Sequence, residues 1–218
     1  MNINRIPLSV VALAIIAAPA LPADKEGFKP LFNGKDLTGW KQRNGTAKYS
    51  VEKGGVILGK TNEGSPNSFL CTTKHFGDFE LTFEVKVDDA LNSGVQFRSA
   101  SRKDFKNFRV HGPQVEIAVN GTAGFIYGEA LGTGWLSDKA KVDRKTKAFK
   151  NGKWNKYRVL ARGKSIKTWV NGVPVADLVD ERSKMSSGFI GLQVHGIRRG
   201  SGPYEVRWRK IMLRDLSK

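Results

Sequence analysis

The chain has 218 residues, of which 39% are apolar, and its 24 glycines fit a loop-rich protein with one sizeable domain. Its 37 lysines and arginines exceed the 20 aspartates and glutamates, so the formal net charge at pH 7 is +17. The basic residues are spread along the chain and are densest at residues 139–150, which we interpret as a solvated loop.

The N-terminus has the pattern of a secretory signal peptide. Arg5 is followed by an uncharged apolar run at residues 8–18, and then by small residues around Pro19 that suit cleavage. The run is shorter than the roughly 20 apolar residues of a membrane span, although an uncleaved anchor is the alternative. We therefore expect residues 1–23 to be a signal peptide and residues 24–218 to be one domain. The mature protein would be secreted or periplasmic, with no membrane span and no nucleic-acid partner.

The remaining chain alternates short apolar–polar runs with tight-turn signals. Asn-Gly, which accepts the positive φ angles of hairpin turns, occurs five times. The pattern predicts one short helix within residues 138–147 and pairing of the two terminal apolar segments, 31–32 and 211–213. The predicted strands are residues 50–51, 56–58, 79–87, 93–98, two strands within 111–128, 154–161, 165–170, 173–175, 188–195 and 204–213. Many short strands with regular turns predict an all-β sandwich or barrel.

One of these strands combines a core face with a polar face. Side chains alternate along a strand, so Gln114 and Glu116 point one way while Val115 and Ile117 point the other. A strand that packs against a core and presents a carboxylate and an amide on its other side is suited to the floor of a binding cleft.

Five segments in order resemble the secreted bacterial family of 3-keto-disaccharide hydrolase domains. Together they span nearly all of the mature chain. They are residues 31–40 (LFNGKDLTGW), 92–98 (NSGVQFR), 112–117 (GPQVEI), 152–155 (GKWN), and the closing pair 191–196 (GLQVHG) with 206–211 (VRWRKI).

The resemblance implies a concanavalin A-like jelly roll, in which two curved antiparallel sheets leave a concave polar face. It also implies action on glycosides or disaccharides already oxidised to a ketone at C3. Two positions depart from the family pattern: many members have Glu before Gln where this chain has Gln114 before Glu116, and Asn is more usual at Lys210.

A ketone at C3 acidifies the C2 proton, so such a site needs a base near C2, a positive or hydrogen-donating group at the C3 oxygen, and a proton donor for the leaving group. Glu116 is the first candidate for acid or base, His195 for proton transfer, and Arg98 for holding an oxyanion. Each has a structural alternative: an exposed strand carboxylate, a structural histidine, and an ion-pair partner of Glu116.

Further polar and aromatic residues could bind the sugar. Polar candidates are Asn92, Gln96, Gln114 and Gln193, and aromatic candidates for stacking on a sugar face are Tyr127, Trp135 and Trp169, although most tryptophans in a sandwich belong to the core. Trp154 and Trp208 are assigned to core or edge packing, and Glu80 and Glu84 to a solvated outer face.

No cofactor is specified by the sequence. His111, Glu116 and His195 could hold a divalent metal, but their spacing is not diagnostic. Cys71 is the only cysteine, which excludes an intrachain disulfide and a multi-cysteine zinc site, and we expect its thiol to be buried and inert.

Three functions remain open from the sequence. The first is a hydrolase that cleaves 3-keto-glycosides by C2 proton abstraction, elimination and hydration, with an oligosaccharide or glycoside as its substrate. The second is a non-catalytic carbohydrate-binding module on the same fold. The third is an adhesion or surface-interaction protein that uses the positive charge.

Overall fold

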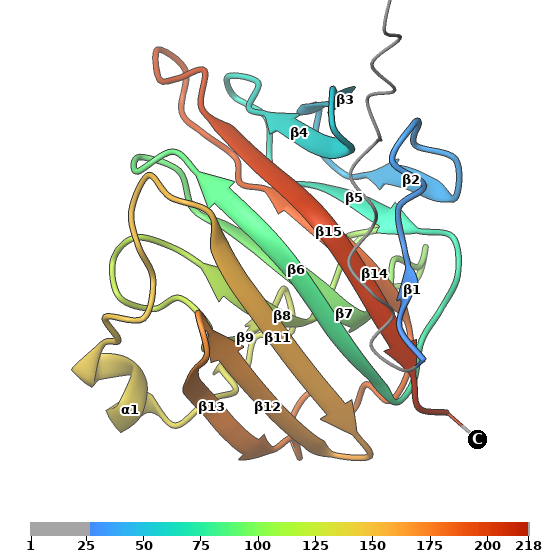
Figure 1. Ribbon diagram of the computed structural model, residues 1–218, viewed down its shortest axis with the longest axis vertical. Helices are drawn as coiled ribbons and strands as arrows, with labels where there is room; N and C mark the ends of the chain where they lie inside the picture. Colours follow the sequence, from blue (N-terminus) through green and yellow to red (C-terminus); the bar gives the residue numbers. More distant parts are fainter. Residues whose placement is uncertain (1–26, 218) are drawn as a thin grey trace, which may run out of the picture.

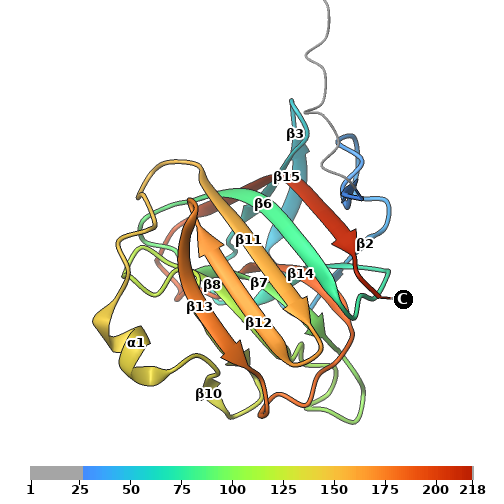
Figure 2. The same ribbon diagram turned by 60° about the horizontal axis from the view of Figure 1, so that its bottom comes forward.

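The computed structural model describes residues 27–217, so the predicted signal peptide lies outside the described residues. Two antiparallel sheets stack face to face (Figures 1 and 2). One, here sheet A, runs in the order β13-β12-β11-β6-β15-β4-β3, with β1 added against β15, and the other, sheet B, runs β10-β9-β8-β7-β14-β5-β2.

Most strands coincide with the predicted runs, whereas β2 and β10 lie where no strand was predicted. In sheet A the strands are β1 (Lys29–Pro30), β3 (Lys48–Glu52), β4 (Val56–Lys60), β6 (Phe79–Val87), β11 (Asn155–Arg162), β12 (Ser165–Val170), β13 (Val173–Val179) and β15 (Glu205–Asp215). In sheet B they are β2 (Trp40–Arg43), β5 (Ser68–Thr72), β7 (Ser93–Ser99), β8 (Gly112–Ile117), β9 (Ile126–Glu129), β10 (Gly134–Trp135) and β14 (Phe189–Val194). The all-β sandwich prediction is therefore confirmed.

The predicted pairing of the chain's two ends is also confirmed. Lys29 lies opposite Leu213 in the β1–β15 ladder, and the Leu31 amide donates to the Ile211 carbonyl at 2.9 Å. The predicted helix is α1 (Lys139–Arg144), and the Asp138 side chain caps its N-terminus by accepting from the Ala140 amide. No helix within residues 27–217 has the length and apolar character that a membrane span requires.

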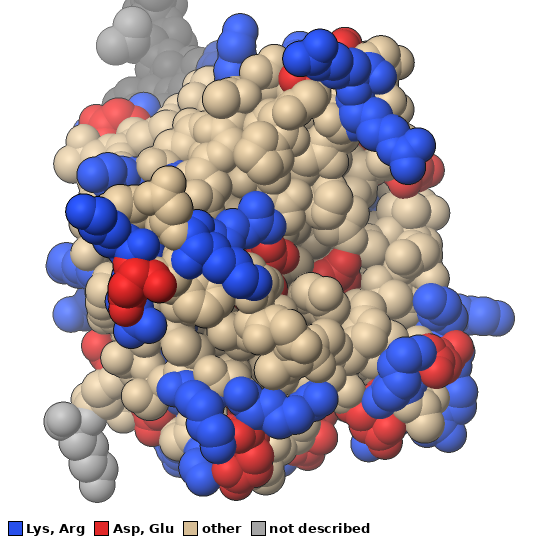
Figure 3. Space-filling view, turned by 180° about the vertical axis from the view of Figure 1, so that it is seen from behind, with Lys and Arg blue, Asp and Glu red and all other residues tan. Residues whose placement is uncertain are grey.

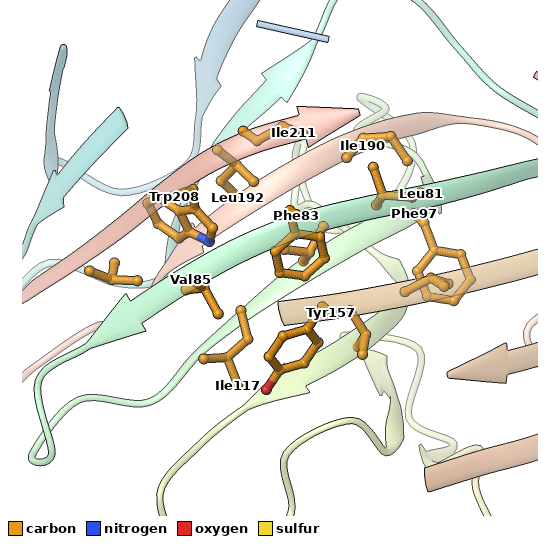
Figure 4. Packing of buried hydrophobic residues seen from close by; sticks show 14 of the residues in the cluster. Leu81, Phe83, Val85, Phe97, Ile117, Tyr157, Ile190, Leu192, Trp208 and Ile211 are labelled. Atoms are coloured by element: carbon orange, nitrogen blue, oxygen red, sulfur yellow. The ribbon is translucent and has the colours of Figure 1, made fainter. Parts of the chain in front are cut away.

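The core fills the space between the sheets, because each strand contributes its inward alternate side chains (Figure 4). Phe83 of β6 and Tyr157 of β11 stack with ring centroids 5.0 Å apart, and Trp208 of β15 is fully buried. The Tyr157 hydroxyl reaches the opposite sheet, where it donates to the backbone carbonyl of Glu116 at 3.2 Å. The core thus fixes the backbone of β8 from behind.

The Cys71 thiol is buried in a small second cluster with Phe69 and Phe189. Burial raises its pKa to about 12, against the opposing charge of Arg43, so the thiolate is scarce at neutral pH. The expectation of an inert thiol agrees with this environment.

Candidate functional site

A cleft of about 440 Å³ opens on the outer face of sheet B. Figure 3 shows this side of the molecule, where acidic side chains lie recessed in a hollow that basic side chains flank. The cleft floor is formed by β8, β9 and β14, and the loops and strand ends beside them add the rest. The lining residues are Asn67, Asn92, Arg109, Gln114, Glu116, Tyr127, Glu129, Ala130, Trp135, Gln193 and His195. Seven of these had been predicted as site residues: Asn92, Gln114, Glu116, Tyr127, Trp135, Gln193 and His195.

Glu116 lies on the cleft floor with only 7% of its surface exposed. The Asn92 amide donates to its Oε1, and the Gln114 amide donates to its Oε2 at 3.1 Å. Burial raises the pKa of Glu116 to about 7; the two amide hydrogen bonds oppose the rise and the charge of Glu129 adds to it. A carboxyl with this pKa can accept and release a proton near neutral pH.

A chain of side-chain hydrogen bonds orients the carboxyl. The Ser99 hydroxyl donates to Gln96 Oε1 at 2.9 Å, Gln96 Nε2 donates to Gln114 Oε1 at 3.1 Å, and Gln114 Nε2 then faces Glu116. Each amide oxygen is engaged as an acceptor, so each amide nitrogen points toward the next member of the chain. Gln96 does not line the cleft and therefore acts here as a support rather than a sugar contact.

Gly94 of β7 gives Gln114 its space. Gly94 lies opposite Glu116 in the β7–β8 ladder, and a Cβ at this position would come within 2.4 to 2.6 Å of three Gln114 side-chain atoms. The absence of a side chain at residue 94 thus allows the amide to lie across the strand and reach the carboxyl.

His195 follows β14 at one side of the cleft. Its Nδ1 lies 2.8 Å from the Gly196 carbonyl oxygen, which can only accept, so in the neutral ring Nδ1 carries the proton and Nε2 has the free lone pair. The Asn67 side chain accepts from the Gly196 amide at 2.9 Å and holds the same turn. The imidazole is therefore oriented to use Nε2 in proton transfer or ligation.

An ion pair that the sequence reasoning missed completes the charged lining. Arg109 Nη2 lies 2.7 Å from Glu129 Oε1, and Glu129 is 7% exposed. Glu129 could have been found from alternation, since it shares a strand face with Tyr127 on β9. Arg109 precedes β8 in a loop, where no periodicity indicates direction.

Two walls of the cleft are suited to a polyhydroxylated ring. Gln193 is 1% exposed, and neither its Nε2 nor its Oε1 has a hydrogen-bond partner in the described part of the chain. A buried amide without partners is costly unless a ligand or water satisfies it. Tyr127 and Trp135 meet edge to face with centroids 5.3 Å apart and provide the aromatic wall.

The structure places Arg98 outside this cleft, so the expectation that it lies beside Glu116 is wrong. Its φ of +47° and a register shift in the β14–β7 ladder end the alternation on which that expectation rested. Its guanidinium donates to the carbonyls of Gly77 and Gly163 at 2.7 and 2.6 Å and to Asp78 at 2.8 Å. Because these partners adjoin strands of sheet A, Arg98 ties the two sheets together.

Two other candidates also lie elsewhere. Trp169 is on β12 in sheet A, where the Arg158 guanidinium carbon lies 4.1 Å from its ring centroid. His111 is 2% exposed, stacks on Phe105 and engages its Nδ1 with the Arg109 carbonyl. Between residues 27 and 217, no three His, Cys, Asp or Glu side chains are grouped as a metal site would require, so His111, Glu116 and His195 do not form a common ligand set.

Comparison with known proteins identifies the family and the fold. A family model described as the 3-keto-alpha-glucoside-1,2-lyase-like domain matches residues 27–214, which confirms the resemblance found in the sequence motifs. The 3-keto-disaccharide hydrolase of Bacteroides thetaiotaomicron is 30% identical over 83 residues, which are 34% of this chain and 28% of that protein. The chain therefore matches little more than a quarter of that relative's length.

Solved structures with similar folds include a provisionally assigned glycosyl hydrolase from Parabacteroides distasonis, with a TM-score of 0.64, 24% identity and coverage of 88% of this chain and 95% of that one. A Bacillus subtilis protein of unknown function with a galectin-like fold has a TM-score of 0.63 at 10% identity, covering 86% and 94% of the two chains. The carbohydrate-binding module CBM66 from the same organism has a TM-score of 0.51 at 20% identity, covering 81% and 96%. These likenesses confirm the jelly-roll fold.

Proposed function

The chain belongs to the family of 3-keto-alpha-glucoside-1,2-lyase-like domains, and on that premise we propose that its cleft cleaves 3-keto-glycosides or 3-keto-disaccharides. The observation that carries the proposal is Glu116: a buried carboxyl with a pKa of about 7, held by two amides at the floor of a sugar-sized cleft. The apolar leader at residues 8–18 supports a secreted or periplasmic location for this reaction.

In the proposed reaction, the ionised Glu116 removes the proton from C2 of the sugar, and the electron pair moves into an enolate on the C3 oxygen. The enolate then collapses to re-form the ketone, a C1=C2 double bond forms, and the C1–O bond to the leaving group breaks. Water adds across the double bond, with hydroxyl at C1 and hydrogen at C2. The net result is hydrolysis without an oxidant or reductant.

Arg109, rather than Arg98, supplies the cation in this proposal. Its contact with Glu129 holds the guanidinium in the cleft lining and leaves other N–H groups to stabilise the C3 enolate oxygen. His195, when protonated, donates to the leaving oxygen through Nε2. Gln193 and the aromatic wall bind the hydroxyl groups and the apolar ring face of the sugar.

A panel of 3-keto-glucosides and 3-keto-disaccharides, with their unoxidised parents as controls, tests the reaction. We expect product release only from the keto sugars, and loss of nearly all turnover in Glu116→Gln and His195→Ala. Glu181→Gln should keep its turnover, because it removes an exposed carboxylate that does not line the cleft. Turnover retained by both cleft variants would refute the assignment. A parallel series with a chelator shows whether a divalent metal takes part.

A carbohydrate-binding module is the second candidate, and the unpartnered Gln193 amide together with the Tyr127–Trp135 wall favours it independently of the acid–base groups. This reading would be correct if the wild type bound keto or parent glycans in calorimetry but released no product from any of them.

A further inference from the structure

The outer face of sheet A, on the opposite side of the sandwich from the cleft, repeats one arrangement twice. Arg158 lies 4.1 Å from the Trp169 ring centroid and donates through Nε to Glu80 at 2.6 Å. In the same way, Arg209 lies 4.0 Å from the Trp154 ring centroid and donates through Nε to Glu84 at 2.7 Å. In each unit a tryptophan and a glutamate hold one guanidinium in place, and neither unit contributes to the cleft.

The two units leave the guanidinium ends available. Within the described chain, the Nη atoms of Arg158 and Arg209 make no hydrogen bonds, and these side chains are 41% and 33% exposed. An arginine whose Nε and ring-stacking face are already fixed loses little conformational freedom when its two Nη groups bind an anion.

Positive charge exceeds negative charge around both units. Glu80 pairs with Arg158 and Arg214, and Glu84 pairs with Arg209 and Lys210, so each glutamate has two basic partners. The exposed residues Lys86 and Lys156 on the same face form no ion pair with any residue from 27 to 217. Six basic and two acidic side chains give 6 − 2 = +4 for this group, which we call the basic face.

The basic face also has a hollow beside one unit. A cavity of about 320 Å³ is lined by Trp169, Arg158, Lys156, Thr82 and Glu80, among others. It therefore combines cations with hydroxyl and carboxylate groups that can bond to sugar hydroxyls. Glu80 and Glu84 are four residues apart on one extended strand, which separates the two units by roughly 14 Å. A ligand that reaches both must be an extended molecule with several anionic groups.

We propose that the basic face is a second binding site, for an acidic polysaccharide that carries carboxylate or sulfate groups. The arrangement of the tryptophans favours this polymer over single-stranded nucleic acid. Nucleic-acid binders stack bases on open aromatic rings, whereas here a guanidinium already covers each tryptophan. Binding through this face would hold the protein on an anionic glycan while the cleft, on the other sheet, stays open to its own substrate.

Binding of polygalacturonate, measured by calorimetry or affinity electrophoresis at low and moderate salt, tests the site. We expect the wild type to bind polygalacturonate and not neutral dextran, and Arg158→Gln/Arg209→Gln to bind at least tenfold more weakly. The control Lys141→Gln/Arg144→Gln removes the same charge from exposed positions of α1 and should bind as the wild type does.

Because Arg158 and Arg209 neutralise partly buried glutamates, a second variant guards against misfolding. Lys86→Gln/Lys156→Gln changes exposed residues without described ion pairs, and it should weaken binding in the same direction while leaving the circular dichroism spectrum and cleft activity intact. Equal weakening by this variant and by the α1 control would overturn the proposal, because binding would then follow net charge alone. Tighter binding of a single-stranded oligonucleotide than of polygalacturonate would overturn the choice of ligand. Failure of the wild type to bind polygalacturonate would overturn the site. Neither result would affect the proposed cleft reaction.

Discussion

Replacing Glu116 by glutamine should abolish turnover. It should also make the variant gain stability relative to the wild type as the pH rises through 7, because the wild type loses stability there. Burial raises the pKa of Glu116 from an ordinary 4.5 to about 7. A folded-state pKa above the unfolded value means that the stability contribution is fully present below pH 4.5 and is lost as the pH rises through 7. The difference of about 2.5 pH units at 1.36 kcal/mol each corresponds to about 3 kcal/mol of unfolding free energy.

Urea unfolding of the wild type and Glu116→Gln at pH 4 and pH 8 measures this difference. In Glu116→Gln the new side-chain NH2 group faces an amide of Asn92 or Gln114 that is itself a donor, so one hydrogen bond is lost. This loss lowers the free energy of unfolding by about 1–3 kcal/mol, by the same amount at pH 4 and at pH 8. The advantage of the variant over the wild type should therefore grow by about 3 kcal/mol between pH 4 and pH 8, whatever its starting value. Other titrating groups are common to both proteins and cancel.

The pH dependence of turnover gives a second measure of the same group. If ionised Glu116 is the base, the rising limb of the pH profile of kcat/KM on a 3-keto-glucoside should lie near pH 7. A stability difference that is identical at pH 4 and pH 8 would refute the raised pKa, and a wild-type rate that is already maximal at pH 5 would refute the role as a base.

Three further predictions follow from contacts elsewhere. Gly94→Ala should displace the Gln114 amide, lower kcat at least tenfold and shift the rising limb of the pH profile of kcat/KM. If Gly94 had only a structural role, the rising limb would stay at the same pH. Arg98→Met removes the buried guanidinium from Asp78 and two carbonyls, so urea unfolding should show a loss of about 1–3 kcal/mol of unfolding free energy. KM should not change at a temperature where the variant stays folded, and a large change in KM would show that Arg98 acts in the cleft. The Cys71 thiol should react with a disulfide reagent at pH 8 only after denaturant is added, and rapid labelling of the native protein would contradict its burial.

Alternation along strands was enough to predict most of the fold and the cleft floor. Gln114 and Glu116 share a face of β8 because a regular strand has a period of two, and β8 has no bulge between them. The same rule failed at Arg98, where a positive φ and a register shift turn the side chain toward the other sheet. Local pattern does not reveal a bulge, so this error could not be avoided from the sequence.

Sheet membership was a separate limit. Trp169 alternates as a surface residue should, but alternation does not tell which of the two outer faces a strand contributes to, and β12 belongs to the sheet without the cleft. Arg109 was missed because its direction depends on a loop and on its contact with Glu129, which lies 20 residues further along the chain. Both depend on how distant strands are ordered, which is a tertiary property.

The glutamates on the two outer faces show how the chain sets their pKa values in opposite directions. Burial alone would raise the pKa of Glu80 and of Glu84, but two basic side chains beside each outweigh it and lower both values. Glu116 is buried to a similar extent as Glu80 but has two neutral amides in place of cations, so the effect of burial prevails and its pKa rises. The one arginine in the cleft lining is paired with Glu129 instead. In a chain with a net charge of +17, keeping cations away from a single carboxyl is what leaves it able to take up a proton near neutral pH.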